Sequence, residues 1–140
     1  MQSTAPNPVA SGRVPAGRLV QVGVLAAILS ASANALVLAI ASSLVGAVVI
    51  PPDGAVTFGQ VVGASLAGAV GAAAIFAVIG RFTRRPIRNF WGVAAAGLLL
   101  SFLPIALAGA TGSSAVTLAL MHVVAAITNV GLLTTLGRKA

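Results

Sequence analysis

The side chains of this sequence that could do chemistry are few, and most of them lie inside long apolar runs. Asn34, Ser101 and His122 are such residues. A polar side chain within an apolar membrane helix is costly, so its position indicates either a functional site or a fixed helix register. His122 is the single histidine, and a neutral imidazole can relay a proton, bind a metal or ligate haem. Each of these uses normally needs a second specific partner.

The sequence offers few such partners. The runs contain no Asp, no Glu and no second His, and Met121 lies about 100° around a helix from His122. The absence of cysteine excludes thiol redox chemistry and Cys-based metal sites. A serine nucleophile would also lack a base and an orienting carboxylate. We therefore expect no enzyme, no cofactor and no metal site on one chain. Metal ligation across an oligomer, or a quinone- or haem-binding subunit, is left as an alternative.

The runs that carry these residues are long enough to cross a membrane. Of the 140 residues 59% are hydrophobic, and Asp53 is the only acidic one. A spanning helix needs about 20 apolar residues to cross a hydrocarbon layer of roughly 30 Å. The sequence predicts an all-α fold, a membrane-embedded four-helix bundle with short loops. Its spans are predicted at about 19–46, 58–80, 90–110 and 114–136.

The segment before the first span has a different composition. Residues 1–17 hold three prolines among Ser, Ala and Gly, which is typical of a disordered tail. The four spans then form one domain over residues 18–137. Ala31-Ser32-Ala33 resembles a signal-peptide cleavage site, but the apolar run continues to Ile50. We therefore favour an uncleaved helix over a cleaved signal peptide.

The basic residues predict the orientation of the helices. Lys and Arg near helix ends are retained in the cytoplasm. Alternate ends of the four spans carry all eight basic residues, and Asp53 lies on the other side. They are Arg13, Arg18, Arg81, Arg84, Arg85, Arg88, Arg138 and Lys139. The pattern predicts a multi-pass plasma-membrane protein with both termini in the cytoplasm.

The basic composition also limits the partners. The pI is about 12, yet no zinc-ligand spacing, aromatic-rich basic surface or binding motif supports a nucleic-acid partner. The arginines of the loop after the second span favour anionic lipid headgroups of the bilayer. An acidic cytoplasmic partner or a phosphorylated lipid is the alternative. The arginines are Arg81, Arg84, Arg85 and Arg88.

Small residues recur at helical spacing in the first two spans. Helices in lipid associate where small residues let their backbones approach. The second span carries Gly59, Gly63, Ala67 and Gly71 at every fourth position, and the first carries Gly23, Ala27, Ala31 and Ala35. We expect these two faces to pack together as an antiparallel hairpin.

The helical rise places three of the polar residues at one depth. With span midpoints near residues 31, 100 and 125, Asn34, Ser101 and His122 lie within about 5 Å of the midplane. The structural interpretation is that His122 hydrogen-bonds to Asn34 or Ser101 and fixes the helix register. Ser101 would also relieve the backbone interrupted by Pro104. Asn129 is interpreted as an interfacial or inter-helix hydrogen bonder.

Short motifs around these residues resemble a known family. They are Arg84-Arg85-Pro86-x-Arg88-x-Phe90, Leu100-Ser101-x-x-Pro104, Leu120-Met121-His122, and Pro51-Pro52 after a span containing Asn34. Over residues 18–137 the chain resembles an uncharacterised family of small actinobacterial four-helix membrane proteins, a domain of unknown function. The resemblance implies a four-helix fold in the plasma membrane and no particular activity.

Two functions remain in competition on the sequence alone. The first is a non-enzymatic membrane protein that acts through helix association, as a homo-oligomer or as an accessory subunit of a membrane-protein partner. The second is a small transporter or channel for an apolar or weakly basic solute. In that case Asn34, Ser101 and His122 would line the path.

Overall fold

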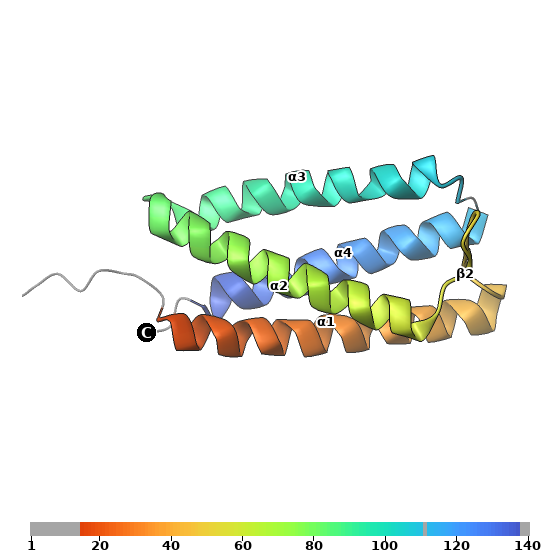
Figure 1. Cartoon of the computed structure of the whole chain (residues 1–140), viewed down its shortest axis with the longest axis horizontal. Coiled ribbons are helices and arrows are strands. Elements are labelled where there is room, and N and C mark those ends of the chain that lie inside the picture. The colour runs from red at the N-terminus through yellow and green to blue at the C-terminus, as the bar shows by residue number, and fades with distance from the viewer. Residues whose placement is uncertain (1–14, 111, 138–140) are drawn as a thin grey trace, which may run out of the picture.

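Four long helices lie side by side in the computed structural model, which describes residues 15–110 and 112–137 (Figure 1). They are α1 (Ala16–Val45), α2 (Phe58–Phe82), α3 (Pro86–Leu107) and α4 (Gly112–Thr135). Each helix is long and apolar enough to cross a membrane. The predicted all-α four-helix architecture is confirmed. Residues 1–14 of the predicted tail, and with them Arg13, lie outside the described residues, as do Arg138 and Lys139.

The first helix begins at Ala16, earlier than the predicted residue 19. Pro15 precedes it, in keeping with the preference for proline at the start of a helix. The Nε–H of Arg18 donates a hydrogen bond of 3.0 Å to the carbonyl oxygen of Leu136, just beyond the end of α4. A carbonyl at a helix C-terminus lacks an intrahelical partner and carries partial negative charge. The hydrogen bond therefore holds the first turn of α1 against the end of α4.

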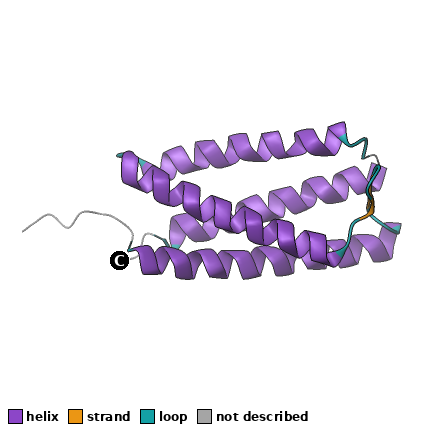
Figure 2. Cartoon of the chain, in the orientation of Figure 1, coloured by secondary structure: helices purple, strands orange, loops and turns teal. Residues whose placement is uncertain are grey.

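A small hairpin joins α1 to α2, where the sequence predicted only a turn. Strand β1 (Val49–Ile50) pairs antiparallel with β2 (Gly54–Ala55), as Figure 2 shows in orange. The backbone N–H of Val49 donates to Ser114 Oγ at 3.0 Å, which ties the hairpin to α4. Strands of two residues have no periodicity that a sequence could reveal.

The starts of α2 and α3 follow local sequence signals. Thr57 and Gln60 form a capping box, in which each side chain accepts a hydrogen bond from the other's backbone N–H. The third helix begins at Pro86, before the predicted residue 90. Proline is favoured in the first turn because its missing N–H costs no helical hydrogen bond there.

Helix α1 packs along both α2 and α4, whereas α3 is attached more loosely. One buried cluster contains Val22, Phe76, Phe90, Val130 and Leu133. A second contains Leu38, Val48, Val61, Leu118 and Met121. Among the described residues of α3, only Phe90 is buried. Its ring packs edge-on against Phe76, with 4.9 Å between the ring centres.

The sequence predicted that the small residues of α2 pack against α1, and within one chain this prediction is wrong. The two helices do pack closely, and a Cβ on Gly23 of α1 would lie 3.3 Å from Ala73 Cβ of α2. However, the buried residues of α2 are Val61, Ser65, Ala69 and Phe76. Gly59, Gly63 and Ala67 are exposed, and Gly71 is half-buried. Positions two residues apart lie about 200° apart on a helix, so the face that contains Ser65 turns Gly63 outward.

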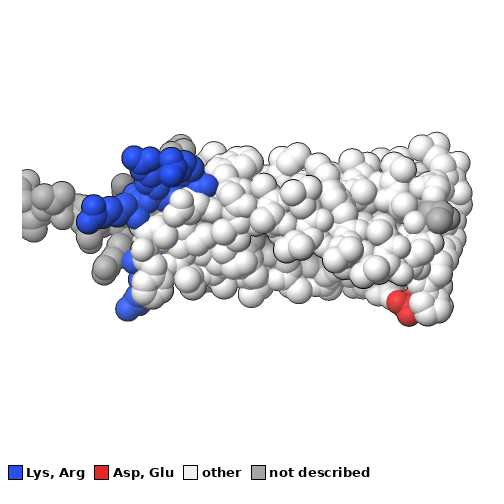
Figure 3. Space-filling model, turned by 90° about the horizontal axis from the view of Figure 1, so that it is seen from above, with Lys and Arg blue, Asp and Glu red and all other residues white. Residues whose placement is uncertain are grey.

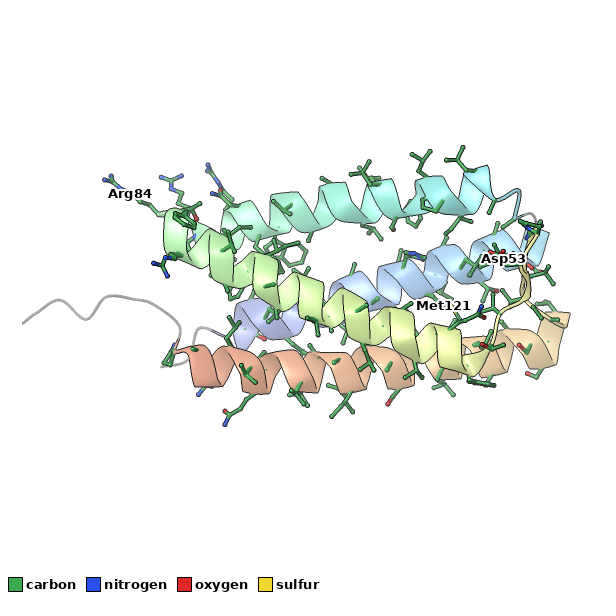
Figure 4. All side chains as sticks on the ribbon, viewed as in Figure 1. Asp53, Arg84 and Met121 are labelled. Atoms are coloured by element: carbon green, nitrogen blue, oxygen red, sulfur yellow. The ribbon has the colours of Figure 1, made fainter. Side chains whose placement is uncertain are left out.

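Charge divides the molecule into two ends. The described arginines are Arg18, Arg81, Arg84, Arg85 and Arg88, and Figure 3 shows all Lys and Arg side chains in view at one end. Asp53 lies at the other end, as its label and that of Arg84 show in Figure 4. We call these the basic end and the Asp53 end.

Candidate functional site

A cleft of about 610 Å³ lies between α2, α3 and α4, and Asn34 of α1 is among the residues that line it. Most of its lining is apolar or small, as at Gly68, Gly97, Leu98 and Ala126. Glycine and alanine on the facing helices leave the space that larger side chains would fill. The cleft is a concave feature of the described structure to which a ligand could bind.

The cleft opens sideways between α2 and α3. The lining residues that remain exposed, including Ala64, Gly68 and Ile75, come from α2, and Val93 and Gly97 come from α3. In Figure 1 these helices meet at the basic end and diverge toward the Asp53 end. Both helices are candidate membrane spans, so in a bilayer the opening would lie at the depth of the lipid tails.

Bulky apolar side chains lie among the lining residues at both ends of the cleft. Phe90 lines it at the basic end and packs on Phe76. Ile50 and Val56 of the hairpin segment line it at the Asp53 end. The exposed lining residues lie on α2 and α3, so the lateral opening provides access to the cleft.

All three residues of the predicted polar layer line this one cleft. Asn34, Ser101 and His122 reach it from α1, α3 and α4. The structure thus brings together the three helices as the depth argument predicted. No hydrogen bond links these three side chains to one another in the described structure, which corrects the proposed pairing of His122 with Asn34 or Ser101.

Asn34 is bound to α2 instead. Its Nδ2 donates to Ser65 Oγ at 3.1 Å, and the side chain is only 5% exposed. Its Oδ1 is buried without a hydrogen-bond partner. Asn34 therefore ties α1 to α2 with one side of its amide and leaves an acceptor on the other.

His122 bonds to its own helix. Nδ1 lies 2.7 Å from the carbonyl oxygen of Leu118, one turn earlier. A carbonyl only accepts, so Nδ1 carries the hydrogen, and Nε2 of the neutral ring is an acceptor. The ring also stands edge-on to Phe102, with 6.4 Å between ring centres.

Ser101 likewise bonds within its helix, to the carbonyl oxygen of Leu98 at 2.6 Å. The carbonyl that Pro104 deprives of its usual donor is that of Leu100, four residues before it. Ser101 therefore does not fill the gap as the sequence analysis expected. Back-bonding to a carbonyl one turn earlier is a common alternative for serine in a helix.

Asn129 is the lining residue whose role the sequence analysis missed. It is 5% exposed, its Nδ2 donates to the carbonyl oxygen of Ala125 at 2.8 Å, and its Oδ1 is buried without a partner. Its place toward the end of the span suggested an interfacial residue. Its spacing of seven residues from His122 was the useful signal, because residues seven apart share one face of a helix.

The chemistry of the cleft is hydrogen bonding in apolar surroundings. Within residues 15–110 and 112–137 no group of three His, Cys, Asp or Glu side chains could hold a metal ion. The lining joins apolar walls to a few polar groups, the usual composition of a small-molecule site.

Replacing Asn34 by Leu, Ser65 by Ala, and both together tests their hydrogen bond. We expect the two residues to be coupled by about 0.6–1 kcal/mol in the free energy of unfolding, the usual size for such pairs in membrane proteins. The measurement is the unfolding midpoint in SDS, followed by the fluorescence of Trp91. Strictly additive effects of the two substitutions would show that the bond contributes nothing.

Residues 14–139 match a family of unknown function, DUF6069. The chain belongs to this family. The match includes all four helices and every residue that lines the cleft. It confirms the expected resemblance to a family of unknown function. The chain has four apolar helices that are long enough to span a membrane. No curated protein and no solved structure matches the chain.

Proposed function

We propose that this integral membrane protein is non-enzymatic and binds a lipid-soluble small molecule within the bilayer. The observation that carries the proposal is the cleft's lateral opening between α2 and α3 at membrane depth. A ligand dissolved in the lipid could reach Asn34 and His122 through it without crossing water. The volume of about 610 Å³ lies within the range of about 300–1,000 Å³ that small-molecule sites occupy.

The apolar side chains at the two ends of the cleft favour binding over conduction of a water-soluble solute. A channel for a water-soluble solute needs a path that reaches both membrane surfaces. Here Phe90 lies at one end of the cleft, and Ile50 and Val56 lie at the other. The transport hypothesis allowed an apolar or a weakly basic solute, and this geometry supports the apolar one.

Filling the cleft tests the proposal. Gly68 lines the cleft and Gly63 faces outward on the same helix, and a Cβ at either position would meet no atom within 4 Å. We expect Gly68→Leu to lose a small molecule that native mass spectrometry detects on the wild-type protein from mild detergent. Gly63→Leu should retain it, because its new side chain points away from the cleft. Equal retention by both variants, or no bound molecule on the wild type, would contradict the proposal.

Helix association is a second candidate function, and it rests on a different surface. On α2 an exposed stripe is formed by Gly59, Gly63 and Ala67, and none of the described helices covers it. Small residues of this kind let a second helix approach closely in lipid. On this hypothesis Gly63→Leu, not Gly68→Leu, should convert a homo-oligomer to monomer, or release a membrane-protein partner, in the same mass spectra. A wild-type protein that is monomeric and free of partners would exclude it.

We further propose that the basic end faces the cytoplasm of a plasma-membrane protein, with both termini on that side. The positions of the described arginines and of Asp53 support this orientation. Arg81, Arg84 and Arg85 are exposed there, where they would contact anionic lipid headgroups. The proposal includes no nucleic-acid partner.

Single cysteines test the orientation cleanly because the chain has none of its own. In intact cells without an outer permeability barrier, a membrane-impermeant maleimide should label Asp53→Cys and leave Arg84→Cys unlabelled. In inside-out vesicles the pattern should reverse. Labelling of both variants from the same side would rule out the orientation.

A further inference from the structure

We infer that the cleft selects a neutral lipid-soluble alcohol, whose hydroxyl group donates a hydrogen bond at the level of Asn34 and His122. This inference rests on the proposed function, since it names the chemical class of the molecule that enters the cleft. It comes from the unsatisfied hydrogen-bonding groups of the lining.

The unsatisfied groups of the two asparagines are acceptors. Nδ2 of Asn34 donates to Ser65 Oγ, and Nδ2 of Asn129 donates to the carbonyl oxygen of Ala125. The Oδ1 atoms of both side chains are buried and lack a partner. A buried polar atom without a hydrogen bond is unfavourable, and native proteins contain few of them. Both asparagines line the cleft, so a ligand with a donor group there would satisfy atoms that the protein leaves unpaired.

His122 adds a third acceptor. Its Nδ1–H is used by the carbonyl oxygen of Leu118, which leaves the lone pair of Nε2 on the neutral ring. The hydroxyl of Ser101 is used by the carbonyl oxygen of Leu98. In the middle of the cleft Oδ1 of Asn34 and Nε2 of His122 therefore remain as acceptors, beside the Ser65 hydroxyl, which accepts from Asn34 Nδ2 and has no acceptor of its own in the described structure.

Asn34 and His122 lie at one level of the bundle. Leu38, Val61 and Leu118 pack in one buried cluster. One helical turn nearer the basic end, the same three helices carry Asn34 on α1, Ser65 on α2 and His122 on α4. The cleft is thus lined at one depth by Asn34 from α1 and His122 from α4.

The charge of the lining selects among donor groups. Among the described residues that line the cleft, none is Lys, Arg, Asp or Glu. A fatty acid would lack a cation, and an ammonium group would lack a carboxylate, so either would have to leave water without a counter-charge. A hydroxyl group donates one hydrogen bond without carrying charge, and its apolar chain can lie among the glycines and alanines toward the opening.

A matched pair of photoreactive probes tests this selection. The probes are hexadecanol bearing a diazirine in its chain and the methyl ether of the same molecule, which has lost the donor. The full-length protein in phosphatidylcholine vesicles is irradiated with each probe, and labelled peptides are quantified by mass spectrometry. We expect the alcohol to label cleft residues of α2 and α3 roughly threefold to tenfold more than the ether, the size of one hydrogen bond.

Two variants assign the preference to the acceptors. Asn34→Leu and His122→Phe should each lower the alcohol-to-ether ratio toward one. The matched control is Asn89→Leu, which alters an exposed asparagine at the basic end and should keep the wild-type ratio. If one variant fails to fold, the wild-type ratio and the other variant still decide.

The outcomes separate the inference from the function on which it rests. Equal labelling of the cleft by both probes, or a preference for the ether, would overturn the inference and leave the binding function intact. Labelling of the cleft no stronger than that of the outward-facing residues around Gly63 would overturn the binding function itself. A wild-type preference that both variants retain would also overturn the assignment to Asn34 and His122.

Discussion

Ala26→Leu is expected to lower the free energy of unfolding by about 2 kcal/mol, within the usual range for overpacking a tight interior. Ala26 is 0% exposed on the face of α1 that also contains Ser30, which is equally buried. Helix α1 packs along both α2 and α4, so a larger side chain there must push one of these helices away. The effect should be among the largest for one substitution because two interfaces share this face.

The measurement is reversible unfolding in SDS, followed by the fluorescence of Trp91, the only tryptophan of the chain. Ala39→Leu is the matched control, because it makes the same change at an exposed position of α1. We expect its unfolding midpoint to equal that of the wild type. Equal midpoints for Ala26→Leu and Ala39→Leu would mean that the α1 interface is not tightly packed.

Phe90→Ala is expected to cost about 3 kcal/mol and to loosen α3 in particular. The estimate is the lower end of the range for Phe→Ala in protein cores, because a lipid tail can replace some of the lost contacts. Phe90 is 2% exposed and is the one buried residue among those described in α3. Its removal also takes away the edge-on contact with Phe76 at the basic end of the cleft.

Selective loosening of α3 distinguishes this variant from a general loss of stability. A cysteine at Ala94, which is half-buried on α3 and packs against the cluster that contains Phe90, should react faster with a lipid-soluble maleimide in the Phe90→Ala background. A cysteine at Ala27, buried on α1, should keep its slow rate. The control substitution is Phe82→Ala, which removes an exposed phenylalanine at the end of α2. An unchanged rate at position 94 would show that Phe90 does not hold α3.

The sequence was sufficient to predict the number of helices and most of their ends. The length of a span follows from the thickness of the hydrocarbon layer, and its ends follow from charged residues, prolines and caps close by in the chain. The capping box of Thr57 and Gln60 is a signal of this local kind. The separation of Arg84 from Asp53 follows as well, since each successive span reverses the side of the membrane.

The depth of Asn34, Ser101 and His122 also follows from the sequence, because the rise per residue of a helix is nearly constant. Depth, however, does not determine how each helix is rotated about its axis. In water the apolar face of a helix turns inward, but in lipid both faces are apolar and that signal is weak. Hence the side of α2 that contains Gly63 was assigned to the interface, which in fact contains Ser65.

The tertiary structure alone decided the features that depend on helix rotation and spacing. It placed Asn34 against Ser65 instead of His122, and it brought Asn129 to the cleft. It also left Phe90 as the one buried residue among those described in α3, with a cleft that opens between α2 and α3. These features arise from packing between residues far apart in the chain, for which a single membrane sequence carries little pattern. Local chain physics and the thickness of the bilayer determined the elements, and side-chain packing among them determined the site.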